Sequence, residues 1–319
     1  MLSIVTTLYK SAPYLEAFLR TCREVVTQLE ISDFELICVD DGSPDDSVAW
    51  LKFQQENYPE LVIVELSRNF GHHRAVMAGL AHAKGERIFL IDCDMEVAPD
   101  VLTDFWTRMN SSGADVVYGF VEERTGSVWK RWTGSLFWRI FNRLSETQVP
   151  PNIVTERLMS RRYVKALLTL GDQSPFMAGM FHWVGFSQEG MPVQRTPKAE
   201  ASTYTFTRQL TLITNAITGF SARPLRILFT LGIFISLLSF GYGSFVVLRK
   251  LIFPESVASG FSAIASLIVF FCGITVSSIG LVGLYLSRMF SQVMNRPLYV
   301  VKDVWEANSL ESNKKDELS

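Results

Sequence analysis

The sequence is poor in cysteine and has no excess of charge of either sign. Four cysteines stand singly in apolar stretches, without a Cys-x-x-Cys spacing, among 319 residues. This distribution excludes a disulfide framework and favours reduced thiols in a cytoplasmic domain. The formal net charge of −2 is not that of a general nucleic-acid-binding protein, so we expect no nucleic-acid partner.

Charged residues are absent from two long apolar runs near the carboxyl terminus. Residues 227–248 and 261–286 contain no Asp, Glu, Lys or Arg. Each run is long enough to cross a hydrocarbon layer of about 30 Å as a helix. We therefore predict two transmembrane helices that form a hairpin within residues 225–288.

The flanks of the hairpin indicate its orientation. Basic residues precede the first run and follow the second, namely Arg223, Arg226, Arg288, Arg296 and Lys302, and they outnumber Arg249 and Lys250 between the runs. Positively charged flanks favour the cytoplasmic side. The amino terminus also lacks the basic-then-apolar order of a signal peptide. We expect a multi-pass protein of the inner (plasma) membrane with its first domain and its tail, 289–319, in the cytoplasm.

Short β-rich runs alternate with helical patterns over the first part of the chain. The predicted strands are residues 2–8, 34–39, 61–66, 87–91 and 115–119. This alternation is typical of an α/β fold with a mostly parallel, Rossmann-like sheet. Polar residues follow each of the first four strands, and ligands of such sheets bind beyond the carboxyl ends of the strands. The pattern predicts one site at that edge.

The most informative polar run is Asp92-Cys93-Asp94, which follows an apolar strand. Two carboxylates at this spacing can hold Mg²⁺ or Mn²⁺ against a diphosphate, because these cations prefer oxygen ligands and bind phosphates well. Such a triplet alone is commonly a solvated turn. Its position after a buried strand favours the metal site.

Asp40-Asp41-Gly42-Ser43 follows the second strand in the same way. The carboxylates can accept hydrogen bonds from a base or a ribose hydroxyl, and Gly42 permits a tight turn. Helix capping by Ser43 or Asp45 is the alternative, and both roles can coexist. His72 and His73 begin a later helix, and we interpret them as surface or capping residues.

Two amphipathic patterns lie between the sheet and the apolar runs. Residues 129–144 combine apolar helical spacing with four basic residues, and residues 204–224 carry a second apolar stripe. A basic amphipathic helix can lie in a membrane interface, although a core helix with solvated arginines has the same pattern. The second pattern is predicted to lie along the bilayer surface.

Taken together, these runs resemble glycosyltransferase family 2, which has the GT-A fold. Within it the chain is similar to the polyprenyl-phosphate glycosyltransferases, which include dolichol-phosphate mannose synthases and bactoprenol glucosyltransferases. The landmarks occur in family order: Val5-Thr-Thr-Leu-Tyr9, Val39-Asp-Asp-Gly-Ser43, Ser67-Arg-Asn-Phe-Gly71, Asp92-Cys-Asp94, Arg157-Leu-Met-Ser160 and the terminal pair of apolar runs. The resemblance covers nearly the whole chain.

The resemblance implies roles for individual residues. The expected nucleotide-sugar-binding residues are Thr7, Tyr9, Asp40, Asp41, Asp92, Arg195, Ser202 and Tyr204. The expected metal ligands are Asp92, Asp94 and Glu96, and the expected catalytic residues are Asp94, Glu156 and Arg157. The expected acceptor-phosphate-binding residues are Arg124 and Arg131.

One departure concerns the catalytic base. Thr155 stands where bactoprenol enzymes commonly have Asp, and Glu156 is adjacent. A phosphate monoester has a second pKa of about 6, so a polyprenyl phosphate is largely dianionic near neutral pH. Such an acceptor needs little deprotonation, and positioning together with stabilisation of the leaving diphosphate can carry most of the catalysis.

The resemblance predicts an inverting, metal-dependent hexosyltransferase. Its expected donor is a nucleotide-sugar, for which a UDP-sugar is favoured and a GDP-sugar stays open, and its expected acceptor is undecaprenyl phosphate for cell-surface glycan modification. A homo-oligomer is also expected. The predicted domains are a catalytic domain (1–203), a juxtamembrane helix (204–224), the hairpin and the polar tail. The alternatives are another lipid or glycan acceptor, or a catalytically silent membrane scaffold.

Overall fold

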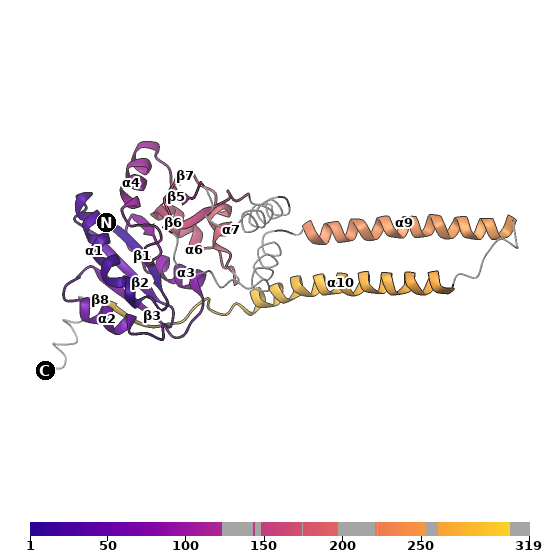
Figure 1. Cartoon of the computed structure of the whole chain (residues 1–319), viewed down its shortest axis with the longest axis horizontal. Helices are drawn as coiled ribbons and strands as arrows, with labels where there is room; N and C mark the ends of the chain where they lie inside the picture. Colours follow the sequence, from indigo (N-terminus) through magenta and orange to yellow (C-terminus); the bar gives the residue numbers. More distant parts are fainter. Residues whose placement is uncertain are drawn as a thin grey trace.

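The computed structural model describes residues 1–122, 143, 148–173, 175–196, 221, 223–252 and 261–306. A sheet covered by helices on both faces forms one end of the described chain, and two long helices project from it (Figure 1). The α/β class predicted from the sequence is therefore confirmed.

The sheet has eight strands in the order β7-β5-β6-β4-β1-β2-β3-β8. The strands are β1 (Leu2–Leu8), β2 (Phe34–Asp40), β3 (Leu61–Leu66), β4 (Arg87–Leu90), β5 (Val116–Phe120), β6 (Ile153–Ser160), β7 (Gln188–Pro192) and β8 (Val301–Glu306). The central strands β4, β1, β2 and β3 are parallel, whereas β6 runs antiparallel to β4 and β5. The five strands predicted from the sequence are β1 to β5, displaced by no more than a residue at an end.

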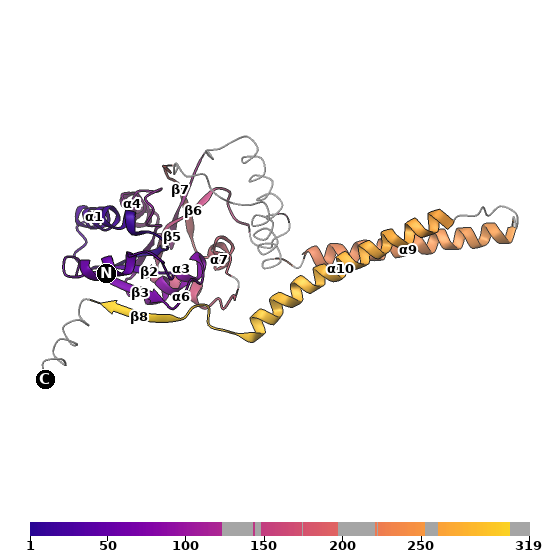
Figure 2. The ribbon, with the colours of Figure 1, turned by 60° about the horizontal axis from the view of Figure 1, so that its bottom comes forward.

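Helices cover the two faces of the sheet in separate layers (Figure 2). One face packs against α1 (Ala12–Gln28), α2 (Ser47–Gln54) and α4 (Val101–Ser112), and the other against α3 (His72–His82), α6 (Arg161–Leu168) and α7 (Met177–Trp183). Because side chains alternate along a strand, Ile4 joins the core on the α1 face and Val5 joins the core on the α3 face. Both cores are apolar, which explains why the central strands have apolar residues on both faces.

Helix α3 lies very close to the sheet because of Gly79. A Cβ atom at this position would lie 2.4 Å from Val5 Cγ1 and 2.9 Å from Val39 Cγ2, so no larger residue fits without a shift. This contact fixes the height of α3 above the sheet. It thereby places the first turn of α3, which begins at His72, at the carboxyl ends of the parallel strands.

The two projecting helices are α9 (Arg223–Ile252) and α10 (Phe261–Met294), which lie side by side (Figures 1 and 2). They contain the two apolar runs of the sequence. Their large apolar side chains are exposed, including Phe229 at 71% and Ile279 at 66%. Among the described residues, one stretch, Gly273–Met294 in α10, is apolar and long enough to cross a membrane. The prediction of two such spans is thus supported for one of them.

The segment after α10 differs from the polar tail predicted for 289–319. Helix α10 continues to Met294, and β8 then pairs antiparallel with β3 at the edge of the sheet. Lys302 forms an ion pair with Glu65, and Lys84 Nζ lies 2.7 Å from a carboxylate oxygen of Glu306. The segment predicted as a polar tail therefore contains a strand, β8, that completes the sheet.

Candidate active site

The carboxyl ends of the central strands meet at one edge of the sheet. In the parallel register, Leu8 of β1 pairs with Asp40 of β2, and Asp40 pairs with Glu65 of β3. Strand β6 runs the other way, so that Arg157 pairs with Leu90 near the end of β4. The antiparallel strand therefore brings its own beginning to the edge where the Asp-x-Asp loop leaves β4.

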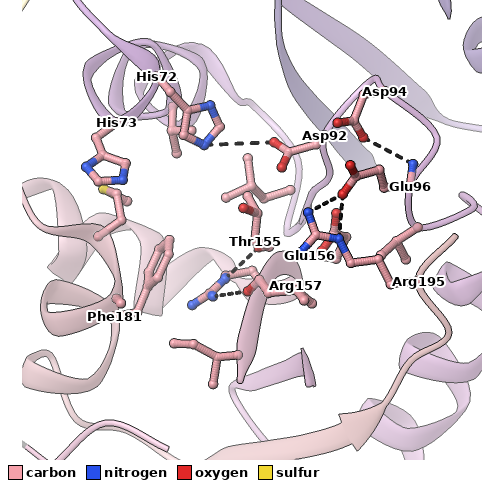
Figure 3. Close-up of a pocket in the computed structure, with 17 residues that line it drawn as sticks. His72, His73, Asp92, Asp94, Glu96, Thr155, Glu156, Arg157, Phe181 and Arg195 are labelled. Carbon is pink, nitrogen blue, oxygen red and sulfur yellow. Dashed lines mark hydrogen bonds and ion pairs between the residues drawn. The ribbon is translucent and has the colours of Figure 1, made fainter. Parts of the chain in front are cut away.

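A pocket of about 230 Å³ opens at this edge (Figure 3). Its polar lining consists of His72, His73, Asp92, Asp94, Glu96, Thr155, Glu156, Arg157 and Arg195, and its apolar lining includes Val76, Leu90, Met177, Ala178 and Phe181. The carboxyl groups come from the loop after β4 and from β6. The apolar wall comes mainly from α3 and α7, so the two sides of the pocket differ in chemistry.

Asp92 and Asp94 bring two carboxylates into the same pocket, as the sequence predicted. Burial raises the pKa of Asp92, an effect that nearby His72 opposes. The Nε2 atom of His72 lies 3.9 Å from Asp92 Oδ1. Asp94 Oδ1 accepts a hydrogen bond of 3.1 Å from the backbone N–H of Glu96. Oxygen donors of this kind suit Mg²⁺ or Mn²⁺. Within the described ranges, no group of three or more His, Cys, Asp or Glu is arranged to hold a metal ion.

Glu96, the third expected metal ligand, has a different partner. Its carboxylate forms an ion pair with the guanidinium of Arg195 (Figure 3). The backbone N–H of Thr196 also donates a 2.8 Å hydrogen bond to the Glu96 carbonyl. The segment after β7 is therefore attached to the Asp-x-Asp loop. In this structure the Glu96 carboxylate is therefore paired with Arg195, whereas Asp92 and Asp94 contribute carboxylate oxygens to the pocket, the kind of ligand that Mg²⁺ and Mn²⁺ prefer.

Glu156, in strand β6, lines the same pocket as these carboxylates. The residue is only 4% exposed. Burial, reinforced by the nearby charges of Asp92 and Asp94, raises the pKa of Glu156 to about 7. A carboxyl group with this pKa exchanges its proton near neutral pH, which suits an acid or a base.

Arg157 is a buried cation in the same pocket. It is 1% exposed, and its Nε and Nη2 atoms donate 2.9 Å hydrogen bonds to the carbonyls of Thr155 and Val154. Its side chain lies 3.4 Å from the centre of the Phe181 ring, and Nη1 is buried without a hydrogen-bond partner. Burial lowers the pKa of Arg157 to about 10, so the group stays charged at neutral pH. An anchored guanidinium with a spare N–H can bind a phosphate oxygen.

The expected nucleoside-binding residues lie at the same edge but do not line this pocket. Asp40 and Asp41 are buried, and burial raises the pKa of each. Asp40 accepts a hydrogen bond from the backbone N–H of Ser43, at 3.1 Å. Asp41 accepts hydrogen bonds from the backbone N–H groups of Phe70 and Gly71, at 2.6 and 2.9 Å. Both carboxylates thus hold the strand-end loops in place.

Helix capping, the alternative for this run, is not observed: the N-cap residue of α2 is Asp46, without a side-chain cap hydrogen bond, and Asp45 makes other contacts. Its carboxylate accepts hydrogen bonds from the backbone of Ala12 at 3.1 Å and from the hydroxyl of Ser47 at 2.7 Å. These contacts lie at the beginnings of α1 and α2. The expected residues Thr7 and Tyr9 follow β1, where Thr7 Oγ1 lies 3.0 Å from His72 Nδ1 and Tyr9 is 50% exposed.

The interpretation of His72 and His73 as surface or capping residues is incomplete: His72 is exposed at the beginning of α3, but both residues also line the pocket. His72 lies between Thr7 and Asp92, as described above. His73 donates a 2.9 Å hydrogen bond through Nδ1 to the carbonyl of Pro175, and burial lowers its pKa. The signal was present in the sequence, since these residues follow the polar loop of β3 just as Asp92 follows β4.

Several predicted site residues lie outside the described residues. They are Arg124, Arg131, Ser202 and Tyr204, together with most of the two amphipathic segments. Their assignment to the acceptor phosphate and to the donor stays a prediction. Of the remaining expected residues, Asp92, Asp94, Glu96, Glu156, Arg157 and Arg195 are brought together in one pocket.

Comparisons with known proteins agree with this architecture. Glycosyl transferase family 2 matches residues 3–180, more than half of the chain. A Mycobacterium tuberculosis (strain CDC 1551 / Oshkosh) protein described as putative glycosyltransferases is 35% identical over 95% of this chain and 88% of its own length. The SfII prophage-derived bactoprenol glucosyl transferase of Shigella flexneri is 29% identical over 96% of this chain and 99% of its own.

Solved structures are more distant. The mannosyltransferase of Pyrobaculum calidifontis, in complex with GDP-Man and Mn²⁺, is 14% identical, covers 92% of this chain and 87% of its own, and has a TM-score of 0.46. The sequence comparisons are decisive by themselves, because the family match spans β1 to β6 and most of α7 and includes both Asp92 and Arg157. The chain belongs to glycosyl transferase family 2.

Proposed function

We propose that this enzyme transfers a hexose from a nucleotide-sugar to a polyprenyl phosphate, with inversion, at the cytoplasmic face of a membrane. The observation that carries the proposal is a single pocket with Asp92 and Asp94 at one side and the buried cation Arg157 at the other. Such a pocket suits a donor diphosphate and an acceptor phosphate. Relatives named bactoprenol glucosyl transferase, aligned over nearly the whole chain, support the choice of acceptor.

In this proposal the acidic side of the pocket receives the donor. Asp92 and Asp94 would hold Mg²⁺ or Mn²⁺, which offsets the charge that develops on the departing nucleoside diphosphate. Arg195 reaches the same side and can bind diphosphate oxygens once it leaves Glu96. Thr7, Tyr9, Asp40 and Asp41 shape the adjoining strand ends, where the nucleoside is proposed to lie.

The transfer step joins an acceptor phosphate oxygen to the anomeric carbon as the bond from that carbon to the diphosphate breaks. The bonding electrons leave with the nucleoside diphosphate. Arg157 would orient the acceptor phosphate through its unpartnered Nη1. Glu156, with a pKa of about 7, can accept the remaining acceptor proton when the phosphate arrives as a monoanion. The phosphate dianion needs no base.

The projecting helices are proposed to be the membrane anchor. The described apolar side chains of α9 and α10 are exposed to an extent that water would oppose, and a hairpin returns the chain to its side of origin. A lipid acceptor and a cytoplasmic nucleotide-sugar then meet at the base of the hairpin. Residues 204–224 and the basic segment 129–144 are proposed to lie at this membrane surface, with Arg124 and Arg131 near the acceptor phosphate.

The competing proposals differ in what they predict for purified protein. Transfer to a glycan or to another lipid predicts product with that acceptor and none with polyprenyl phosphate. A silent scaffold predicts no transfer with any donor. Retention of both Asp92 and Asp94 in an acidic pocket favours an active enzyme.

The test is incubation of the full chain in detergent with radiolabelled UDP-hexoses or GDP-hexoses, Mn²⁺ and undecaprenyl phosphate, followed by lipid extraction. We expect labelled lipid with the wild type and at least a thousandfold less with Asp94→Asn. The matched control Asp104→Asn, on the exposed surface of α4, should keep wild-type activity. Labelled lipid formed equally by Asp94→Asn, or label found only in another acceptor, would contradict the proposal.

A further inference from the structure

Gln292, in the last turn of α10, forms hydrogen bonds with a loop of the catalytic domain. The Nε2 of Gln292 donates a 2.7 Å hydrogen bond to the carbonyl of Gly171, and its Oε1 accepts a 3.1 Å hydrogen bond from the backbone N–H of Gln173. One amide thus uses both a donor and an acceptor on a single loop, 119 and 121 residues away in sequence.

The same loop is bound from its other side by α3. Arg74 Nη2 donates a 3.0 Å hydrogen bond to the carbonyl of Gln173, and Arg74 Nη1 donates another of 3.0 Å to the carbonyl of Phe70. His73, which lines the pocket, donates to the carbonyl of Pro175 at 2.9 Å. The loop therefore lies between the end of α10 and the first turn of α3.

This loop leads directly into the apolar wall of the pocket. Helix α7 begins at Met177, and its residues Met177, Ala178 and Phe181 form that wall. The guanidinium of Arg157 in turn packs against the ring of Phe181. A continuous series of contacts thus runs from α10, through the loop, to the side of the pocket that is proposed to receive the acceptor phosphate.

The side chain next to Gln292 on α10 does not hydrogen-bond to the loop. Adjacent Ser291 directs its hydroxyl back to the carbonyl of Ser287, at 3.0 Å, within the helix. Successive residues of a helix are rotated by about 100°. The two hydrogen bonds of Gln292 therefore restrict both the rotation and the height of α10 relative to the loop.

We propose that Gln292 is a positioning residue that holds the apolar wall of the pocket at a fixed height above the membrane. The inference rests on the proposed function, in which the acceptor is a lipid and α10 is embedded in the bilayer. A lipid phosphate is confined near the bilayer surface, so its attack geometry depends on where the pocket lies relative to that surface. A donor arriving from solution has no such restriction.

The experiment compares two acceptors for the full chain in phospholipid vesicles. One is undecaprenyl phosphate, which is confined to the bilayer, and the other is a short-chain prenyl phosphate that dissolves in water. The variant is Gln292→Met, which keeps side-chain length and removes both hydrogen bonds. The matched control is Ser291→Ala, which removes a hydrogen bond within α10 and leaves the loop untouched.

We expect Gln292→Met to raise KM for undecaprenyl phosphate about tenfold, the order of magnitude of two lost hydrogen bonds. The KM for the short-chain acceptor and the Kd for the donor should match the wild type, as should every constant of Ser291→Ala. Gln292→Glu keeps the hydrogen bond accepted from the backbone N–H of Gln173 and loses the one donated to Gly171. Its KM for undecaprenyl phosphate should therefore lie between those of the wild type and Gln292→Met. A change in KM for undecaprenyl phosphate alone separates positioning from general destabilisation, which would change KM for both acceptors alike.

Two outcomes overturn the inference without affecting the proposed function. These are a wild-type KM for undecaprenyl phosphate in Gln292→Met, or an equal rise for both acceptors. If the wild type itself transfers sugar to neither prenyl phosphate, the proposed function fails instead. A purely structural role of Gln292 would lower the unfolding temperature and leave the ratio of the two KM values unchanged.

Discussion

The guanidinium of Arg195 forms an ion pair with the carboxylate of Glu96, two residues beyond Asp94. The Arg195 side chain is 53% exposed and that of Glu96 is 15% exposed, so the pair forms at the mouth of the pocket. A divalent cation that takes Glu96 as a ligand has to displace Arg195. Metal binding and the position of the segment after β7 are then linked.

This link predicts that Arg195→Gln binds Mn²⁺ more tightly than the wild type, by roughly three- to tenfold, because a competing cation is gone. In a Glu96→Gln background, the same substitution should have no effect. Titration of free Mn²⁺ by electron paramagnetic resonance, without donor, measures both. An equal gain in the two backgrounds would mean that Arg195 acts by general charge and not through Glu96.

Glu156 gives the stability of the fold a distinct pH dependence. Its pKa is about 7 in the folded chain against an ordinary value of 4.5, because burial and the charges of Asp92 and Asp94 disfavour ionisation. Between these two values the folded state holds a proton that the unfolded state releases. The contribution of Glu156 to the free energy of unfolding is therefore greatest below about pH 4.5 and falls as pH rises to about 7, by on the order of 3 kcal/mol.

Replacing Glu156 by Gln removes this titration. We expect the variant to be more stable than the wild type at pH 8 and to change less between pH 5 and 8. Denaturant unfolding in detergent with EDTA, followed by circular dichroism, measures both quantities. Glu56→Gln, at an exposed position, is the control and should follow the wild-type curve. Parallel curves for Glu156→Gln and the wild type would show that Glu156 does not titrate in this range.

The central strands were predictable because each is a short apolar run followed by a polar loop. Strand β7 carries Gln, Glu, Gly and Pro among its five residues, so its strand character comes from pairing with β5 and not from composition. Strand β8 pairs with β3 only because two long helices return the chain to the sheet. A local sequence pattern does not encode such a contact.

The location of the site was predictable for the same reason, whereas the partners of its side chains were not. Asp92 and Asp94 lie where the end of a parallel strand places them. Whether Asp41 faces a ligand or the loop after β3 depends on how two loops approach each other. The partner of Glu96 comes from 99 residues away. These orientations are set by tertiary packing and are not visible in residue spacing.

Substitution of Trp305 tests how much β8 contributes to stability. This strand was not predicted from the sequence. The Trp305 ring packs against the core on the α1 face, Lys52 Nζ lies 3.9 Å from the ring centre, and Gln55 donates a 3.1 Å hydrogen bond to the Trp305 carbonyl. We expect Trp305→Ala to lower the free energy of unfolding by roughly 3 kcal/mol. The neighbouring control Val304→Ala, at a residue 40% exposed, should change it by about 0.5 kcal/mol or less. Similar losses for the two variants, measured by denaturant unfolding, would mean that β8 contributes little.

At Gly42 the loop after β2 lies very close to the loop after β3. Gly113, which has a similar backbone conformation but no such neighbour, is the control for this contact. Both Gly42 and Gly113 have a positive φ, +65° and +69°. A Cβ on Gly42 would lie 2.6 Å from Arg68 C and Asn69 N, whereas a Cβ on Gly113 would have no neighbour within 4 Å. Gly113→Ala should therefore cost only the left-handed backbone penalty of about 1 kcal/mol.

Gly42→Ala should carry the same backbone penalty and in addition separate the two loops, for a total of roughly 2–5 kcal/mol. Because Asp41 holds Phe70 and Gly71 across this junction, the displacement should also weaken binding of the nucleotide-sugar. Denaturant unfolding gives the two free energies, and isothermal titration with the donor gives the two dissociation constants. Equal costs for Gly42→Ala and Gly113→Ala would show that the loops move apart freely, and the contact would then have no part in shaping the nucleotide edge of the site.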